Sequence, residues 1–434
     1  MSVGIVVTSR VTHATLAAYY CHIEDRGLDN EIMEHLVYQD IDVVFGGGAG
    51  YLIPENETLK TKFGDTWKGK RVDGENLMKV LLDRKYTFID NKSDMKKFSG
   101  KKVWGLFDDS HLDPDIDRDN FHPNQPSLAE MTEKAIEILY KNPKGFFLMV
   151  EGSQVDWAAH ANDAVYMTYD FLAFDDAVKV ACDFADKNKN TTVIAFPDHN
   201  TGALALGHEQ SSFPPKYTAT SLEALIDPIK NAKITIQGLL SLLPKDTPPT
   251  FEEFVDIMKK EIGGYWEVLR NKDYKKQADE VYKAALSGSN KSTSTLLSKY
   301  FTVYGWTTNN HTGEDVPVWT YGVQSNLFEK TIDNTDLAKK VAEILKINLS
   351  EISKNLFNDI KVTFPDAVIT DTPGNATCEL IPGVKIYEGK DIISIKGKDH
   401  ELKGICVHAP KINTFFIPKE AFTIIPAFAL GKRK

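Results

Sequence analysis

The chain has 434 residues, of which 42% are hydrophobic, and a formal net charge of -10. This length exceeds what one core of ordinary size organises, so we expect one large domain with insertions or with a small appended domain. The negative charge argues against nucleic acid as the main partner, because phosphate backbones bind basic surfaces. It does not exclude a phosphate ester as substrate, since bound metal ions can reverse the local charge.

The sequence pattern disfavours a membrane span, a signal peptide and a metal site made of cysteines. No stretch approaches the roughly 20 consecutive apolar residues of a membrane helix, so we expect no membrane span. The N-terminus "MSVGIVVTSR" reads as a strand and lacks the features of a signal peptide. The cysteines lack metal-binding or redox spacing, and we expect mostly buried thiols, with a Cys378–Cys406 disulfide disfavoured but open.

Short apolar runs alternate with helical patterns along the first half of the chain. Strands that are apolar throughout are typical of a sheet covered on both faces, so the pattern predicts an α/β fold. We expect a three-layer sandwich around a large, mostly parallel central sheet. The predicted strands are 3–8, 41–48, 102–107, 145–150 and 191–196, and the predicted helices are 14–25, 74–85, 126–139 and 160–186.

The pattern of apolar and charged residues changes twice in the second half of the chain. Residues 239–299 are mostly amphipathic helix with charged faces, which favours a helical insertion. A strand in 316–322 and a helix in 336–347 follow. Residues 360–434 alternate and break at "EGKD" and "GKDH", which predicts a small β-rich C-terminal appendage.

Acids and histidines cluster where predicted strands end. Glu151 follows the strand 145–150, at the edge where open α/β sheets bind ligands. Asp156 and His160 are four residues apart and share a face if the segment is helical. An acid and a histidine so placed suit zinc, although a solvated helix start with acids near its positive end explains them equally well.

Three other stretches carry similar residue types. Asp198 and His199 end the strand 191–196, and His311 precedes a strand. Near the N-terminus, His13 and Thr15 stand at a helix start, with Arg26 about three helical turns later. Arginine is suited to bidentate phosphate binding. Together the set favours two zinc ions, held by Asp and His, and one magnesium ion, held by Glu, Thr and water.

The motifs "TSRVTHATLAA", "VEGSQVDWAAHAND", "DHNTG" and "HTGEDVPV" occur in the order of a known family's signature stretches. Over roughly residues 2–346 the chain resembles the alkaline phosphatases, with 239–299 as an enlarged insertion. The resemblance implies phosphate monoester hydrolysis by a homodimer outside the cytoplasm. It assigns Asp156, His160 and His311 to the first zinc, Asp198 and His199 to the second, Glu151 and Thr15 to magnesium, Arg26 to the phosphate, and His13 and Trp157 to tuning from behind the ligands.

The resemblance also implies a serine nucleophile in an Asp-Ser-Ala motif and a bridging Asp, both well before the position of Thr15. Only fourteen residues precede Thr15, and the chain contains no Asp-Ser-Ala. We therefore expect an N-terminally truncated member with weakened second zinc and magnesium sites and impaired turnover. Ser110 in "LFDDSHLD" follows a strand but lacks the G-x-S-x-G context of a nucleophile.

Two other interpretations stay open. One is a non-catalytic protein that only binds zinc or inorganic phosphate. The other is a different hydrolase or mutase on the same metal scaffold, which the "VTHATLAA" and "HTGEDVPV" stretches disfavour.

Overall fold

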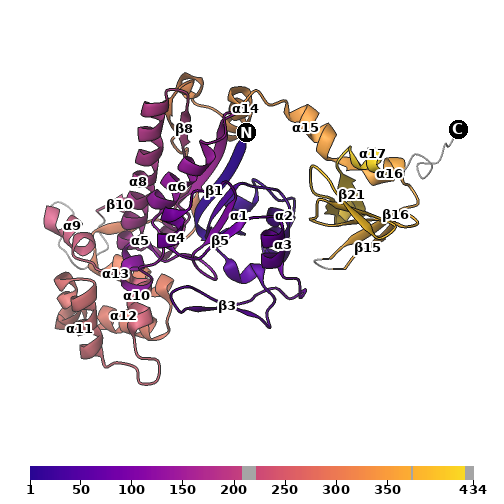
Figure 1. Ribbon diagram of the computed structural model, residues 1–434. Coiled ribbons are helices and arrows are strands. Elements are labelled where there is room, and N and C mark those ends of the chain that lie inside the picture. Colours follow the sequence, from indigo (N-terminus) through magenta and orange to yellow (C-terminus); the bar gives the residue numbers. More distant parts are fainter. Residues whose placement is uncertain (208–220, 373–374, 426–434) are drawn as a thin grey trace. The chain divides into compact units, whose positions relative to one another are not determined.

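The computed structural model describes residues 1–207, 221–372 and 375–425, and Figure 1 traces the chain through them. Contacts divide the chain into two compact units. The first comprises Met1–His111, Lys134–Met149 and Asn326–Lys434, and the second comprises Leu112–Glu133 and Val150–Ser325.

A five-stranded sheet with the order β5-β6-β2-β1-β7 organises the first unit. The pairs β1–β2, β2–β6 and β5–β6 are parallel. The side chains of Val7, Val44 and Trp104 are almost completely buried, as expected for strands covered on both faces. The strands are β1 (Ser2–Arg10), β2 (Val43–Gly47), β5 (Thr87–Ile89), β6 (Val103–Leu106) and β7 (Phe146–Glu151), whose last two residues belong to the second unit. The predicted α/β fold with a parallel central sheet is confirmed.

Short helices and a small hairpin accompany this sheet. Ser127 and Glu130 exchange reciprocal hydrogen bonds at the start of the helix that begins at Leu128, whose residues up to Glu133 belong to the second unit. The elements are α1 (Ala14–Ala17), α2 (Asp29–Val37), α3 (Leu77–Asp83), α4 (Lys92–Lys97), α6 (Leu128–Leu139), β3 (Thr58–Lys60) and β4 (Thr66–Lys68).

The helix predicted over 14–25 is wrong beyond Ala17. The chain turns there and buries Tyr20, whose hydroxyl donates to the carbonyl of Val11 at 2.7 Å. Arg26 consequently lies in a turn and not on a helix.

The helix predicted over 160–186 is two helices in the second unit, α7 (Gln154–Ala161) and α8 (Ala164–Asn188). Asn162 adopts a left-handed conformation with φ 56° and ends α7. Asp163 then caps α8 by accepting from the backbone N–H of Tyr166.

The rest of the second unit consists of small sheets and further helices. Strand β8 (Thr192–Ala195) pairs antiparallel with β13 (Trp319–Gly322) in a two-stranded sheet of its own. Helices α10 to α13 follow one another along the part that was predicted to be helical (Figure 1). The remaining elements are α5 (Asp115–Phe121), β9 (Asn200–Thr201), β10 (Leu204–Leu206), α9 (Leu222–Lys230), α10 (Ile236–Leu242), α11 (Phe251–Glu261), α12 (Lys275–Leu286), α13 (Asn290–Phe301), β11 (Tyr304–Trp306) and β12 (His311–Thr312).

The C-terminal part of the first unit is β-rich. Five antiparallel strands run in the order β15-β16-β17-β18-β19, and three more form β14-β21-β20. Cys378 and Cys406 are free, buried thiols, so the disulfide left open by the sequence is not formed. Burial raises the pKa of the Cys378 thiol to about 12. The elements are α14 (Asn334–Ile344), α15 (Leu349–Leu356), β14 (Asn358–Asp359), α16 (Ile360–Thr363), β15 (Val368–Thr370), β16 (Thr377–Ile381), β17 (Val384–Tyr387), β18 (Ile392–Ile395), β19 (Lys398–Glu401), β20 (Val407–Ala409), β21 (Thr414–Ile417) and α17 (Ala421–Ile424). None of the helices in the described ranges has the length and apolar character needed to cross a bilayer.

Candidate metal centre

Helix α7 and strand β12 bring together three of the predicted zinc ligands. On α7, His160 Nε2 lies 3.4 Å from Asp156 Oδ2. His311 Nε2, at the start of β12, lies 3.7 Å from Asp156 Oδ1. One ligand atom from each of these residues lies within 4.8 Å of the others. A carboxylate and two imidazoles that converge in this way fit zinc.

The pairing of β9 with β12 brings the Asp198–His199 segment to the same place. His311 lies opposite Thr201 in this antiparallel ladder. The rings of His199 and His311 stack, with centroids 3.6 Å apart. His199 Nε2 lies 3.2 Å from Asp198 Oδ2, which forms a second acid–imidazole pair beside the first group.

Gly202 permits this close approach of two segments. It has φ 77°, and a Cβ atom there would lie 2.7 Å from the Trp306 ring and 3.0 Å from the Ala159 carbonyl oxygen. Its backbone N–H donates to the carbonyl of Asn310 at 3.0 Å. Only glycine fits this position without displacing α7 or the segment that carries His311.

Thr201 is a site residue that the sequence interpretation missed. Its hydroxyl donates to Asp156 Oδ1 at 2.6 Å and lies 3.3 Å from His199 Nδ1. The residue is buried, so the hydroxyl touches one member of each acid–imidazole group away from bulk water. A polar residue two places after His199 was the available signal, but nothing in the spacing connects it to Asp156.

The other predicted site residues are placed as follows. Glu151 ends β7 and Trp157 lies on α7, both half-buried. In the first unit, Thr15 lies on α1, and the exposed Arg26 has a guanidinium nitrogen 3.2 Å from His13 Nε2.

Ser110 lies in the loop after β6, where its backbone N–H and carbonyl groups pack against neighbouring residues. Its N–H donates to Asp108 Oδ1 at 2.8 Å. Its carbonyl oxygen would be only 2.1 Å from a Cβ atom on Gly47. These contacts describe a packed loop and do not distinguish the serine side chain.

A second carboxylate group lies in the first unit, where Glu34, Asp73 and Glu75 converge. Lys390 Nζ lies 3.3 Å from Glu34 and 2.9 Å from Glu75, and Arg71 is paired with Asp73. The side chains of Lys390 and Arg71 therefore already neutralise the carboxylates to which a metal ion would bind. Burial raises the pKa of Glu34 to about 8, although Lys390 opposes the shift.

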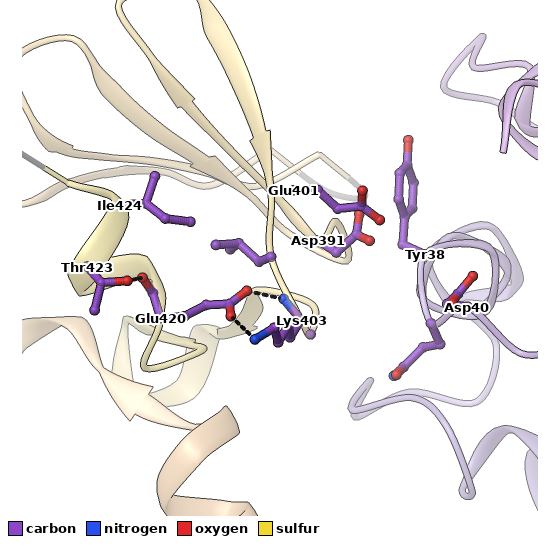
Figure 2. Close-up of a pocket in the computed structure, with 11 residues that line it drawn as sticks. Tyr38, Asp40, Asp391, Glu401, Lys403, Glu420, Thr423 and Ile424 are labelled. Carbon is purple, nitrogen blue, oxygen red and sulfur yellow. Dashed lines mark hydrogen bonds and ion pairs between the residues drawn. The ribbon is translucent and has the colours of Figure 1, made fainter. Parts of the chain in front are cut away.

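The first unit also contains a pocket of about 610 Å³ between Tyr38 and α17 (Figure 2). Asp40, Asp391 and Glu401 line it, and Lys403 is engaged by Glu420. Two of these acids are paired with protein cations, Asp391 with Arg84 and Asp40 with Lys102.

Comparison with known proteins decides the family. The sequence pattern of the alkaline phosphatases matches residues 1–347. The chain belongs to the alkaline phosphatase family. It is 36% identical over 359 residues to alkaline phosphatase 3 of Bacillus subtilis, covering 80% of this chain and 68% of that protein. It is 29% identical over 370 residues to the alkaline phosphatase of Schizosaccharomyces pombe, covering 81% of this chain and 65% of that protein.

Solved structures agree on the fold. The alkaline phosphatase of Thermus thermophilus superposes with a TM-score of 0.67 at 23% identity, over 80% of this chain and 71% of that one. The cold-active enzyme of a Shewanella species gives a TM-score of 0.60 at 25% identity, over 80% and 75% of the two chains. This chain spans about two thirds of the length of the sequence relatives. Membership of the alkaline phosphatase family supports a phosphatase function on phosphate monoesters. It also implies the use of metal ions, without identifying which ions.

Proposed function

We propose that the second unit holds the metal centre of a phosphate monoester hydrolase of the alkaline phosphatase type. The observation that carries the proposal is the convergence of Asp156, His160 and His311 within 4.8 Å, beside the Asp198–His199 pair. Asp156, His160 and His311 would hold a first zinc ion, and Asp198 and His199 a second. Glu151 would serve magnesium, the role that the family resemblance also gives to Thr15.

When bound, such ions supply Lewis acidity and stabilise the charge that develops on phosphate oxygens. The chain's own side chains supply orientation. Thr201 holds the Asp156 carboxylate through its hydroxyl. His160 donates its Nδ1 proton to the carbonyl of Asn309 at 2.6 Å, which leaves Nε2 free to bind an ion. The family resemblance gives Arg26 the role of binding the substrate phosphate, for which a guanidinium is suited, and gives His13 and Trp157 the role of tuning the site.

The level of turnover is part of the proposal. The 434 residues contain no Asp-Ser-Ala motif, and the second zinc has only two assigned ligands. We propose that this chain by itself binds the first zinc best and hydrolyses esters slowly. We further propose that residues 1–346 form the phosphatase core and 360–434 an appendage, and, from the family resemblance, that the protein is a homodimer located outside the cytoplasm.

The test is hydrolysis of a chromogenic phosphate monoester by the full chain with added zinc and magnesium. Turnover above the metal-only background that is abolished in Asp156→Ala supports the phosphatase. Zinc bound at Asp156 without turnover would instead favour the binding function. Absence of both zinc binding and turnover overturns the proposed site.

A further inference from the structure

Asn309 lies at the centre of the contacts behind the metal centre, two residues before His311. Its backbone carbonyl accepts the Nδ1 proton of His160 at 2.6 Å. Its side-chain nitrogen lies 3.0 Å from the carbonyl oxygen of the same histidine. Asn309 therefore contacts His160 at both the ring and the backbone.

The same side-chain nitrogen reaches two further oxygens. Asn162 Oδ1 is 2.7 Å away and Thr295 Oγ1 is 3.0 Å away. Asn162 also donates through Nδ2 to the carbonyl of Thr308 at 2.9 Å. The turn after α7 and the segment that leads to His311 are thus joined by three side chains.

Thr295 belongs to α13, in the helical stretch to which no role has been assigned. Its hydroxyl lies 3.3 Å from the carbonyl of Ala161 and 3.4 Å from Asn162 Oδ1. Contacts between α13 and α7 make the two helices neighbours. The hydroxyl is therefore a direct link from α13 to the end of the helix that carries Asp156 and His160.

We propose that Asn309 is a positioning residue for the first metal site and that α13 supports this site through Thr295. The proposal rests on the proposed function, because it assigns a role toward the metal that Asp156, His160 and His311 would hold. The backbone carbonyl of Asn309 sets the tautomer of His160. The amide side chain fixes the spacing of His160 and His311, which come from segments far apart in the sequence. Partners that orient ligands typically change metal affinity by about 10- to 100-fold when removed.

The experiment measures the zinc affinity of the full chain by competition with a chromogenic chelator. Asn309→Ala removes the amide and keeps the backbone carbonyl, and it should weaken binding about 10- to 100-fold. Asn310→Ala is the matched control, since the exposed side chain of Asn310 makes none of these contacts. Thr295→Val should also weaken binding, whereas Thr295→Ser keeps the hydroxyl and should bind as the parent does.

The melting temperature of the metal-free protein separates positioning from folding. If Asn309→Ala lowers this temperature but binds zinc as tightly as Asn310→Ala does, the positioning role is overturned. Equal zinc affinity in Thr295→Val and Thr295→Ser overturns the role of α13. If the parent protein itself binds no zinc, the proposed function fails first, and that outcome is distinct from either of these.

Discussion

The imidazole rings of His199 and His311 stack, with their centroids 3.6 Å apart and their planes inclined by 24°. Each ring belongs to a different acid–imidazole group. His311 faces Asp156 across 3.7 Å, and His199 faces Asp198 across 3.2 Å. The stack therefore joins two proposed ion positions through direct ring contact, and the two histidines can be tested against each other.

Replacing either histidine should remove a different ion. His311→Ala deletes one of three ligands of the first zinc, so tightly bound zinc should be lost on dialysis. His199→Ala leaves Asp156, His160 and His311 in place, and one zinc should stay bound. Elemental analysis of the dialysed proteins measures both. Equal loss of zinc in the two variants would contradict the division into two sites.

Zinc affinity should depend on the hydroxyl group of Thr201 and not on its methyl group. It donates to Asp156 Oδ1 at 2.6 Å, and hydrogen bonds of this kind restrain a ligating carboxylate. Thr201→Val keeps the shape and removes the donor, so zinc affinity should fall by about 10-fold. Thr201→Ser keeps the donor and serves as the control. Chelator competition gives both affinities, and identical values would rule out this role.

Ser110→Ala should leave any phosphatase activity unchanged. The loop at Ser110 is held by backbone contacts to Asp108 and Gly47, which alanine preserves. Hydrolysis of a chromogenic phosphate ester by the variant and the parent, at equal zinc content, measures the effect. A large loss of turnover in the variant would make Ser110 a nucleophile and would contradict the interpretation of the loop.

Stability of the first unit should fall as the pH rises toward 8, because of Glu34. Burial raises the pKa of this carboxyl to about 8, so the folded protein retains a proton that the unfolded chain has already released. A raised carboxyl pKa therefore contributes stability at low pH that is lost between the unfolded and the folded pKa values. The loss is at most about 1.4 kcal/mol per pH unit across this window.

Glu34→Gln isolates the contribution. Lys390, Glu75 and Arg71 face the same group and remain in the variant. Thermal unfolding from pH 5 to 9 should show a shallower decline for Glu34→Gln than for the parent, and the variant should gain relative stability above pH 8. Parallel profiles for the two proteins would show that Glu34 does not retain its proton in the folded state.

Much of the site could be read from the sequence because its ligands occur in short, dense motifs. Asp156 and His160 share a helix face at a spacing that periodicity reveals, and the structure confirms that α7 carries both. Apolar strands likewise predicted the parallel sheet. The sequence did not predict the break between α7 and α8 at Asn162. A single asparagine within a helical pattern is not a sufficient signal for a left-handed backbone conformation.

The supporting residues could not be found in this way. Thr201 meets Asp156, and Asn309 meets His160, only because β9 pairs with β12 and because α13 contacts α7. These contacts depend on tertiary pairing between distant segments, for which a single sequence carries no periodic signal. The helix predicted over 14–25 failed for a related reason, since burial of Tyr20 overrides local helix propensity.

The central claim is that Asp156, His160 and His311 form a zinc site. Diffraction from crystals of the full chain grown with zinc, recorded at the zinc absorption edge, tests it most directly. We expect an anomalous peak at bonding distance, about 2.0–2.2 Å, from a carboxylate oxygen of Asp156 and from Nε2 of both histidines. Zinc located elsewhere, with no peak among these three side chains, would contradict the claim.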